Sequence, residues 1–252
     1  MSHVIIALWS HPRSMSTAFE RIMRARGDLD CLHEPFMYDY YVNRAKKQMP
    51  HFDARDEHPK TYEAIRDMIL KMAESTPVFF KDMAYYVMPH ILDDEPFLRR
   101  VTHSFLIRDP KASLVSYAKL DPDFTSEELG LSAQWQLWQG IHGQTGLKPV
   151  VVESESVQAD PAGQMQTYWN GVGLSNKPEA LQWGDEVPQD WQQVKGWHEA
   201  AMSSSTVQPM SADKARKIEA DFEKLVASEP RFRAVHEQHL PAYGALRSAA
   251  TA

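Results

Sequence analysis

The stretch Ala7-Leu-Trp-Ser-His-Pro-Arg-Ser-Met-Ser-Thr-Ala-Phe-Glu20 decides the fold, because an apolar strand runs through a short polar loop directly into a helix. A loop that opens a helix directs several unpaired backbone N–H groups, and the positive end of the helix dipole, at one point. Ser14, Ser16 and Thr17 add hydroxyl donors to this loop. The stretch therefore predicts a binding site for a phosphate or sulfate group.

The same loop differs from the Walker A pattern G-x-x-x-x-G-K-[ST]. It has no Gly-Lys pair, and its one cation, Arg13, precedes the turn. This difference argues against ordinary ATP or GTP chemistry. Thr17 and Glu20 also fit a capping box, a structural alternative that leaves the backbone N–H groups available to an anion.

A second strand, sharp turn and helix follow in His103-Ser-Phe-Leu-Ile-Arg-Asp-Pro-Lys-Ala-Ser-Leu-Val-Ser-Tyr117. Asp109 and Pro110 are typical of the N-cap and the first position of a helix. Arg108 closes the strand, and Ser116 lies roughly two helical turns into the helix that follows. We therefore expect Arg108 and Ser116 to face one anion.

With these two motifs in this order, the chain resembles the sulfotransferases that use 3'-phosphoadenosine 5'-phosphosulfate (PAPS). In that family a Pro-[Lys/Arg]-Ser-x-[Ser/Thr]-Thr loop holds the 5'-phosphosulfate, and residues 12–17 match it here. The family's Arg-x7-Ser element holds the 3'-phosphate. The resemblance implies that the residues in contact with PAPS are Arg13, Ser14, Met15, Ser16, Thr17, Arg108 and Ser116.

The resemblance covers residues 1 to about 175, because the segment from Lys148 to Pro161 and the helix to Leu174 also look like family elements. It implies the P-loop NTPase-like sulfotransferase fold, which is α/β with three layers and a central parallel sheet. It also implies transfer of a sulfuryl group from PAPS to a hydroxyl or amine of a small acceptor. Met15 departs from the family, since many members have Gly there and a turn with positive φ would be strained.

A base for the acceptor proton is expected where the second strand ends. Glu34 follows this strand, and several bacterial and Golgi-type sulfotransferases resemble this arrangement, with a Glu in the same place as the proposed base. His33 and His90 remain alternatives to Glu34, because cytosolic animal members use a His after the third strand.

Cations are expected to stabilise the negative charge on the transferring oxygens and on the leaving phosphate. Arg13 is the candidate for the bridging and sulfuryl oxygens. Lys81 ends the third strand and resembles a family lysine that contacts the transferred group, although it also has Asp82 as a neighbour with which to pair. No metal is expected to be required, because a sulfuryl group carries less charge than a phosphoryl group.

Short apolar or β-branched runs bounded by turns predict strands at 4–9, 29–32, 77–81, 103–107 and 149–152. Helices are expected to begin near Thr17, Tyr62, Pro110, Ser126 and Pro161. This alternation predicts a parallel sheet with helices on both faces and ligands at the carboxyl ends of the strands. We expect one domain over residues 1–252, with 211–252 as a helical cover and 38–60 as a long excursion suited to a substrate lid.

The formal net charge of -7 argues against a nucleic-acid-binding surface. Cys31 is the only cysteine, so no internal disulfide can form. No apolar run approaches the ~20 residues of a membrane span, and no leader segment precedes the first strand. We therefore expect a cytoplasmic protein whose partner is a small-molecule acceptor, with no nucleic acid and no membrane, and we leave a homodimer open.

Two other functions fit parts of the sequence. A catalytically inactive nucleotide-binding protein would share the fold, whereas a P-loop small-molecule kinase would need a loop lysine and a metal-binding carboxylate that the sequence does not show. Three further features are expected to be structural: His236 and His239 on a solvated helix face, Trp135 and Trp138 in core packing, and Glu153 and Glu155 in a polar turn.

Overall fold

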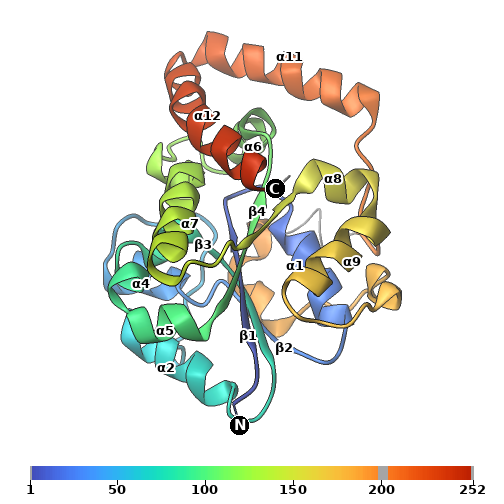
Figure 1. The fold of residues 1–252 in the computed structure, drawn as a ribbon. Helices are drawn as coiled ribbons and strands as arrows, with labels where there is room; N and C mark the ends of the chain where they lie inside the picture. The colour runs from blue at the N-terminus through green and yellow to red at the C-terminus, as the bar shows by residue number, and fades with distance from the viewer. Residues whose placement is uncertain (1, 198–203, 251–252) are drawn as a thin grey trace.

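The computed structural model describes residues 2–197 and 204–250 and is built on one five-stranded parallel sheet (Figure 1). The strand order is β2-β3-β1-β4-β5. The strands are β1 (Ile5–Ser10), β2 (Asp30–His33), β3 (Val78–Met83), β4 (Thr102–Ile107) and β5 (Val150–Glu153). The expected parallel sheet is confirmed, and its bounds differ most at β3, which ends at Met83 rather than Lys81.

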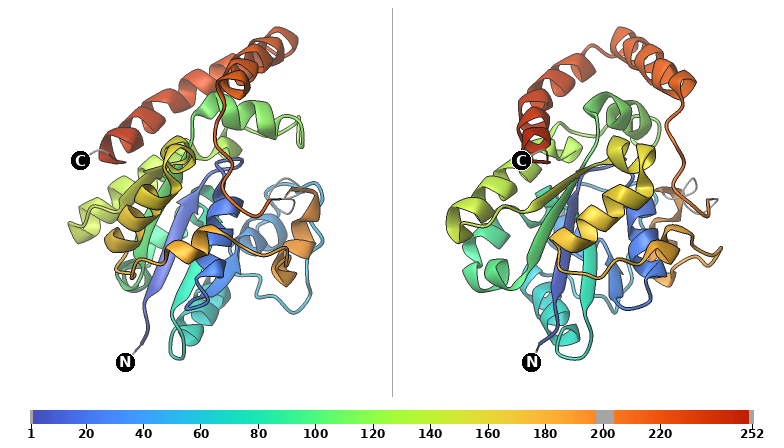
Figure 2. Two further views of the ribbon diagram at one scale, coloured as in Figure 1. Left: turned by 90° about the vertical axis from the view of Figure 1, so that its right-hand side faces the viewer. Right: turned by 45° about the vertical axis from the view of Figure 1, so that its right-hand side comes forward.

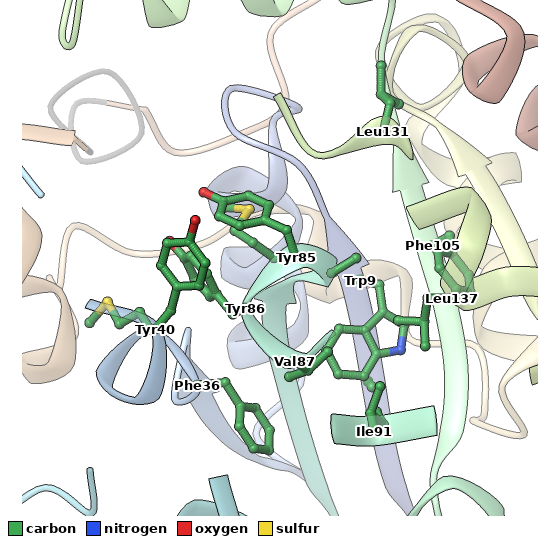
Figure 3. Close-up of a cluster of buried hydrophobic side chains, with 14 of the residues drawn as sticks. Trp9, Phe36, Tyr40, Tyr85, Tyr86, Val87, Ile91, Phe105, Leu131 and Leu137 are labelled. Atoms are coloured by element: carbon green, nitrogen blue, oxygen red, sulfur yellow. The ribbon is translucent and has the colours of Figure 1, made fainter. Parts of the chain in front are cut away.

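Successive side chains of β1 enter two separate cores, one on each face of the sheet. Ile5 and Trp9 belong to the larger cluster, whereas Ile6 and Leu8 belong to the smaller one. The larger cluster, part of which Figure 3 shows around Trp9, packs under α2 (Tyr62–Met72), α3 (Ala84–Val87), α4 (His90–Asp93), α5 (Glu95–Arg100), α6 (Pro110–Tyr117) and α7 (Leu131–Thr145). The smaller cluster packs under α1 (Ser16–Ala25), α8 (Ser154–Ala159), α9 (Pro161–Gly171) and η3 (Pro178–Leu181). Burial on both faces explains the nearly continuous apolar run of the central strand β1.

Several helices begin where the sequence predicts, because local side chains cap them. The side chain of Asp109 accepts from the backbone N–H of Lys111 at 2.8 Å at the start of α6, with Pro110 as the first helical residue. The helix expected near Ser126 is divided instead. A short 3-10 helix, η2 (Glu127–Leu129), precedes α7, and Gly130 separates the two with a φ of 81°.

Residues 38–60, expected as an irregular excursion, begin with a π-helix, η1 (Tyr38–Asn43). Its residues Tyr38, Tyr40 and Tyr41 are buried in the larger cluster. The rest of the excursion runs without regular structure to the start of α2. The first turn of this segment is therefore part of the core, and the role of a substrate lid stays a prediction.

The two last helices, α11 (Ala212–Ser228) and α12 (Arg231–Ala250), lie beyond the carboxyl edge of the sheet, with α11 over α6 and α12 beside α7 (Figure 2). The prediction of a solvated face for His236 and His239 is wrong, because α12 turns this face inward. His239 is buried, donates from Nε2 to the Ser126 carbonyl at 2.8 Å and accepts the Ser132 N–H at 3.2 Å.

Trp135 and Trp138 pack against the larger cluster, as expected, with ring centroids 5.3 Å apart. Residues 251 and 252 of the predicted cover, and 198–203 of the loop before it, lie outside the described residues. Within the described ranges, none of the helices combines the length and the apolar composition needed to cross a membrane.

Candidate active site

The parallel register of the sheet brings the segments at the ends of four strands to one edge. His33 of β2 is level with Lys81 of β3, and Ser10 of β1 is level with Met83. The loop after β1, the residue after β2, the end of β3 and the turn after β4 therefore meet at the carboxyl ends of the strands. A cavity of about 450 Å³ lies there. Its wall includes every predicted site residue except Ser14, namely Arg13, Met15, Ser16, Thr17, Glu34, Lys81, Arg108 and Ser116.

The loop after β1 has the backbone strain that the sequence anticipates at Met15. Met15 is the N-cap of α1 with a φ of 71°, and Arg13 has a φ of 62°. Both residues occupy the left-handed region, which costs a side-chain-bearing residue about 1–3 kcal/mol and is concentrated at functional sites. The side chain of the N-cap residue Met15 makes no capping hydrogen bond, and the first turn of α1 lines the cavity, so the positive end of the helix dipole lies at the cavity edge.

The capping box expected between Thr17 and Glu20 does not form, because α1 already begins at Ser16. The Glu20 carboxylate is directed away from the helix start. It accepts from Trp191 Nε1 at 2.9 Å and lies 2.6 Å from His33 Nδ1. The start of α1 therefore has no acidic side chain that competes with a bound anion.

Arg13 lies at the centre of the predicted anion-binding residues. Its Nε donates to Ser116 Oγ at 2.8 Å, and its Nη1 donates to the Trp197 carbonyl at 2.7 Å. Arg108 Nη1 donates to the Arg13 carbonyl at 2.8 Å. The structure thus joins the two predicted motifs, and we call this part of the cavity, with Arg13, Arg108 and Ser116, the cationic end.

The two guanidinium groups of the cationic end are mostly buried and close to each other. Burial, and then the charge of Arg108, lowers the pKa of Arg13, and burial lowers the pKa of Arg108. Glu155 is the nearest carboxylate recorded for Arg108, 3.9 Å from its Nε, and burial raises the pKa of this carboxyl. The carboxylates of Glu155 and Asp109 oppose this effect of burial at Arg108, and a bound anion would further stabilise the charged form of both arginines.

Glu155 lies in α8, so the polar turn expected at Glu153 and Glu155 is wrong. β5 passes directly into this short helix, whose buried face includes Val157. Glu155 Oε1 accepts from the backbone N–H of Asp109 at 3.2 Å. The helix thus supports the turn that carries Arg108.

Several buried polar atoms around the cationic end have no hydrogen-bond partner among the described residues. They are His11 Nδ1, Ser14 Oγ, Arg108 Nε, Ser113 Oγ and Gln158 Oε1. Most buried polar groups in proteins are paired, and of these five residues Arg108 and Gln158 line the cavity, so their atoms indicate a place for a polar ligand or water. Ser14 itself lies behind the cavity wall, where its carbonyl accepts from Ser154 Oγ.

Glu34 and Lys81 form a buried ion pair between Glu34 Oε1 and Lys81 Nζ. Glu34 has a φ of 45° and accepts from Tyr86 OH at 3.4 Å. The alternative pairing of Lys81 with Asp82 is wrong. Asp82 accepts instead from the backbone N–H groups of Phe36 at 2.8 Å and Met83 at 2.9 Å.

Neither histidine offered as an alternative base has a comparable position. His33 is buried, and its Nε2 is 3.7 Å from Glu34 Oε1. Burial, followed by the charge of Lys81, holds the pKa of His33 well below its ordinary value. His90 begins α4, packs against the ring of Tyr62 with centroids 5.4 Å apart and does not line the cavity.

The other part of the cavity, which we call the tyrosine end, is aromatic and neutral. Its wall contains Tyr41, Met49, Met83, Tyr85, Tyr86, Tyr117, Val194 and Trp197. Figure 3 shows Tyr85 and Tyr86 beside each other at the edge of the larger cluster, and their ring centroids are 4.7 Å apart. Burial raises the pKa of both phenols well above the ordinary value, so they are uncharged.

Most of the tyrosine end was not predicted from the sequence. Residues 38–60 do contribute Tyr41 and Met49, but Tyr85 and Tyr86 come from α3, directly after β3. The Tyr-Tyr pair directly after an apolar strand could have indicated that these side chains lie at the carboxyl edge of the sheet. Trp197, whose carbonyl accepts from Arg13, was not among the predicted site residues.

No group of three or more His, Cys, Asp or Glu side chains within 2–197 and 204–250 has an arrangement that would hold a metal ion. In particular, His236 and His239 are occupied by packing and hydrogen bonds inside the helical cover.

Comparison with known families agrees with this geometry. The family model described as a sulfotransferase domain matches residues 4–236 of the chain. This match extends from β1 into α12 and includes every element that forms the cavity. The chain therefore belongs to the sulfotransferase domain family, which is a family of transferases.

Two curated relatives from Arabidopsis thaliana also match the chain. Branched-chain-amino-acid aminotransferase-like protein 2 is 23% identical over 207 residues, and branched-chain-amino-acid aminotransferase-like protein 1 is 24% identical over 210 residues. Each alignment covers 80% of this chain but 36% of the relative. The chain thus spans just over a third of the length of these relatives.

Two solved structures share the fold at low sequence identity. A sulfotransferase domain from the curacin biosynthetic pathway is 13% identical with a TM-score of 0.52, and the match covers 90% of this chain and 97% of that one. A sulfotransferase domain from the Synechococcus PCC 7002 olefin synthase is 17% identical with a TM-score of 0.53, with 89% and 93% covered. These likenesses bear out the predicted sulfotransferase fold.

Proposed function

We propose that this protein transfers a sulfuryl group from PAPS to a hydroxyl or amine of a small molecule. The observation that carries the proposal is the position of Arg13, which contacts Ser116 and Arg108 within one cavity that also contains Glu34 and Lys81. PAPS supplies the activated sulfuryl group and a good leaving group, adenosine 3',5'-bisphosphate.

The cationic end fits the two anionic groups of PAPS. Arg13, the backbone of residues 15–17 and the hydroxyls of Ser16 and Thr17 would hold the 5'-phosphosulfate. Arg108 and Ser116 would hold the 3'-phosphate. The buried Arg108 Nε, which has no hydrogen-bond partner among the described residues, supports this assignment because a phosphate oxygen would supply the acceptor.

Glu34 would accept the proton that the acceptor hydroxyl loses as its oxygen forms the new bond to sulfur. The bond from sulfur to the bridging oxygen breaks in the same transfer, and the negative charge passes to the leaving bisphosphate. Lys81 and Arg13 would stabilise the charge on the sulfuryl and bridging oxygens. Glu34 is supported in this role by its buried contact with Lys81 at the border of the tyrosine end.

The tyrosine end supports a small acceptor with a neutral, apolar body. Its aromatic side chains offer contact area but no unpaired charge, since Lys81 is paired with Glu34. We further propose that residues 1–252 form one domain in which 211–252 is the cover. Lys214 and Ile218 of α11 support this arrangement, because they contribute to the wall of the cavity.

The test is calorimetric titration with adenosine 3',5'-bisphosphate, followed by a screen of phenols, alcohols and amines with labelled PAPS. Binding together with transfer of label supports the proposal. Binding without transfer to any acceptor would favour the inactive nucleotide-binding protein. No binding, combined with phosphorylation from ATP and Mg²⁺, would favour the kinase.

A further inference from the structure

Gln158 presents an unusual polar group to the cavity. It belongs to the cavity wall, and the residue as a whole is 6% exposed. Its Oε1 is buried and has no hydrogen-bond partner among the described residues. A buried amide oxygen without a partner costs about 1–3 kcal/mol, so its presence here calls for a ligand that supplies a donor.

The orientation of this carboxamide is fixed by the backbone. Gln158 Nε2 donates to the Gln208 carbonyl at 2.8 Å. A flipped amide would place two oxygens against each other, so Oε1 is the atom left to accept. The hydrogen bond from Nε2 therefore fixes Oε1 as the free acceptor of the Gln158 side chain.

Gln158 lies on α8 one helical turn beyond Glu155, which is next to Arg108. Three residues of helix correspond to about 4.5 Å along the axis. Gln158 and Arg108 thus line the same cavity from two neighbouring elements, α8 and the turn after β4. Ala112 and Val115 of α6 line the same cavity and provide apolar contact for a flat ring.

The phosphate and sulfate oxygens of the proposed donor accept hydrogen bonds and cannot satisfy Gln158 Oε1. The remaining donors of the nucleotide are the exocyclic amino group of adenine and the ribose 2'-hydroxyl, and the amino group is the one attached to a flat ring that Ala112 and Val115 can contact. We propose that Gln158 Oε1 accepts from this amino group and thereby selects adenine over bases that carry an oxygen at the same position. This inference rests on the proposed function, because it assumes that the bisphosphate nucleotide occupies the cavity.

The test compares adenosine 3',5'-bisphosphate with inosine 3',5'-bisphosphate, which has an oxygen in place of this amino group and a proton on N1 but shares the ribose and both phosphates. The wild-type protein should bind the adenosine compound more tightly by roughly 5- to 150-fold. Equal affinity for the two compounds would overturn the inference while leaving the proposed function standing. Failure of the adenosine compound to bind would overturn the proposed function and the inference together.

Variants of Gln158 sharpen this test, with the ratio of the two affinities as the readout. Gln158→Met keeps the length and removes the acceptor, so the ratio should fall close to one. Gln166→Met on the exposed side of α9 is the matched control and should keep the wild-type ratio. An unchanged preference in Gln158→Met would also overturn the inference.

Discussion

The cationic end and the tyrosine end of the cavity are built in different ways. The cationic end is formed mainly by the short loops after β1 and β4. The conformation of the first loop is specific, because Arg13 and Met15 both have positive φ. The tyrosine end consists of side chains from η1, α3, α6 and the segment before residue 198, which meet through packing. Chemistry that depends on a loop conformation is therefore visible in sequence, whereas a pocket made by packing is not.

Glu34 lies at the border between the two ends, and its substitution should have the largest effect. Glu34→Gln keeps the size of the side chain and removes its basicity, so turnover should fall by ~10² to 10⁴. Affinity for adenosine 3',5'-bisphosphate should change little, because Arg13 and Arg108 remain. Turnover and calorimetric affinity measured on one preparation check both expectations.

His90→Ala is the matched control for this substitution, because His90 does not line the cavity. An active Glu34→Gln protein beside an inactive His90→Ala protein would move the base to the histidine. Loss of nucleotide affinity in Glu34→Gln would instead make Glu34 a structural residue of the cationic end.

A buried histidine beneath the cationic end should make the stability of the folded protein depend on pH. His11 Nε2 accepts the backbone N–H of Arg108 at 3.1 Å, and burial followed by the charge of Arg108 lowers the pKa of His11 to about 3. In the unfolded chain His11 takes up a proton near pH 6.5, whereas in the folded protein it stays neutral until about pH 3. Protonation therefore favours the unfolded state, and the folded protein loses stability as the pH falls from 6.5 toward 3. At pH 5 the expected loss is about 2 kcal/mol relative to pH 8.

His11→Gln keeps an acceptor near the position of Nε2 but does not titrate. Urea unfolding of both proteins at pH 8 and pH 5 should therefore show a smaller loss of unfolding free energy in the variant. The same loss in both proteins would mean that His11 is protonated equally in the folded and unfolded states.

The smallest expected effect is that of a chelator. If Arg13, Lys81 and Arg108 supply the positive charge that Mg²⁺ supplies in phosphoryl transfer, turnover with PAPS should be unchanged in EDTA. Loss of turnover that added Mg²⁺ restores would show that the cationic end is incomplete without a metal ion.

Much of the fold was predictable because β1, β3 and β5 are short segments rich in apolar residues. The predicted residues Glu34 and Lys81 meet because the register sets β2 beside β3, which follows from parallel pairing. The contact between Arg13 and the Trp197 carbonyl joins residues 184 positions apart, and no local pattern encodes it.

The errors in the helical parts have the same origin. His239 looks like a solvated helical residue in sequence, and it is buried because α12 packs against Ser126 and Ser132. The π-helix Tyr38–Asn43 has no simple period, and its position follows from the burial of its tyrosines. Local sequence thus predicted most helices and strands and most residues that line the cavity at the strand ends. Packing between distant elements determined the burial of His239 and the position of the π-helix.

The central claim is that Arg108 recognises the 3'-phosphate of a bisphosphate nucleotide, and titration of Arg108→Ala tests it most directly. Affinity for adenosine 3',5'-bisphosphate should fall roughly 10- to 150-fold, as expected for loss of hydrogen bonds to a charged group. Affinity for 5'-AMP, which lacks the 3'-phosphate, should change far less, and the exposed control Arg99→Ala should alter neither. Equal weakening of both nucleotides in Arg108→Ala would contradict the account.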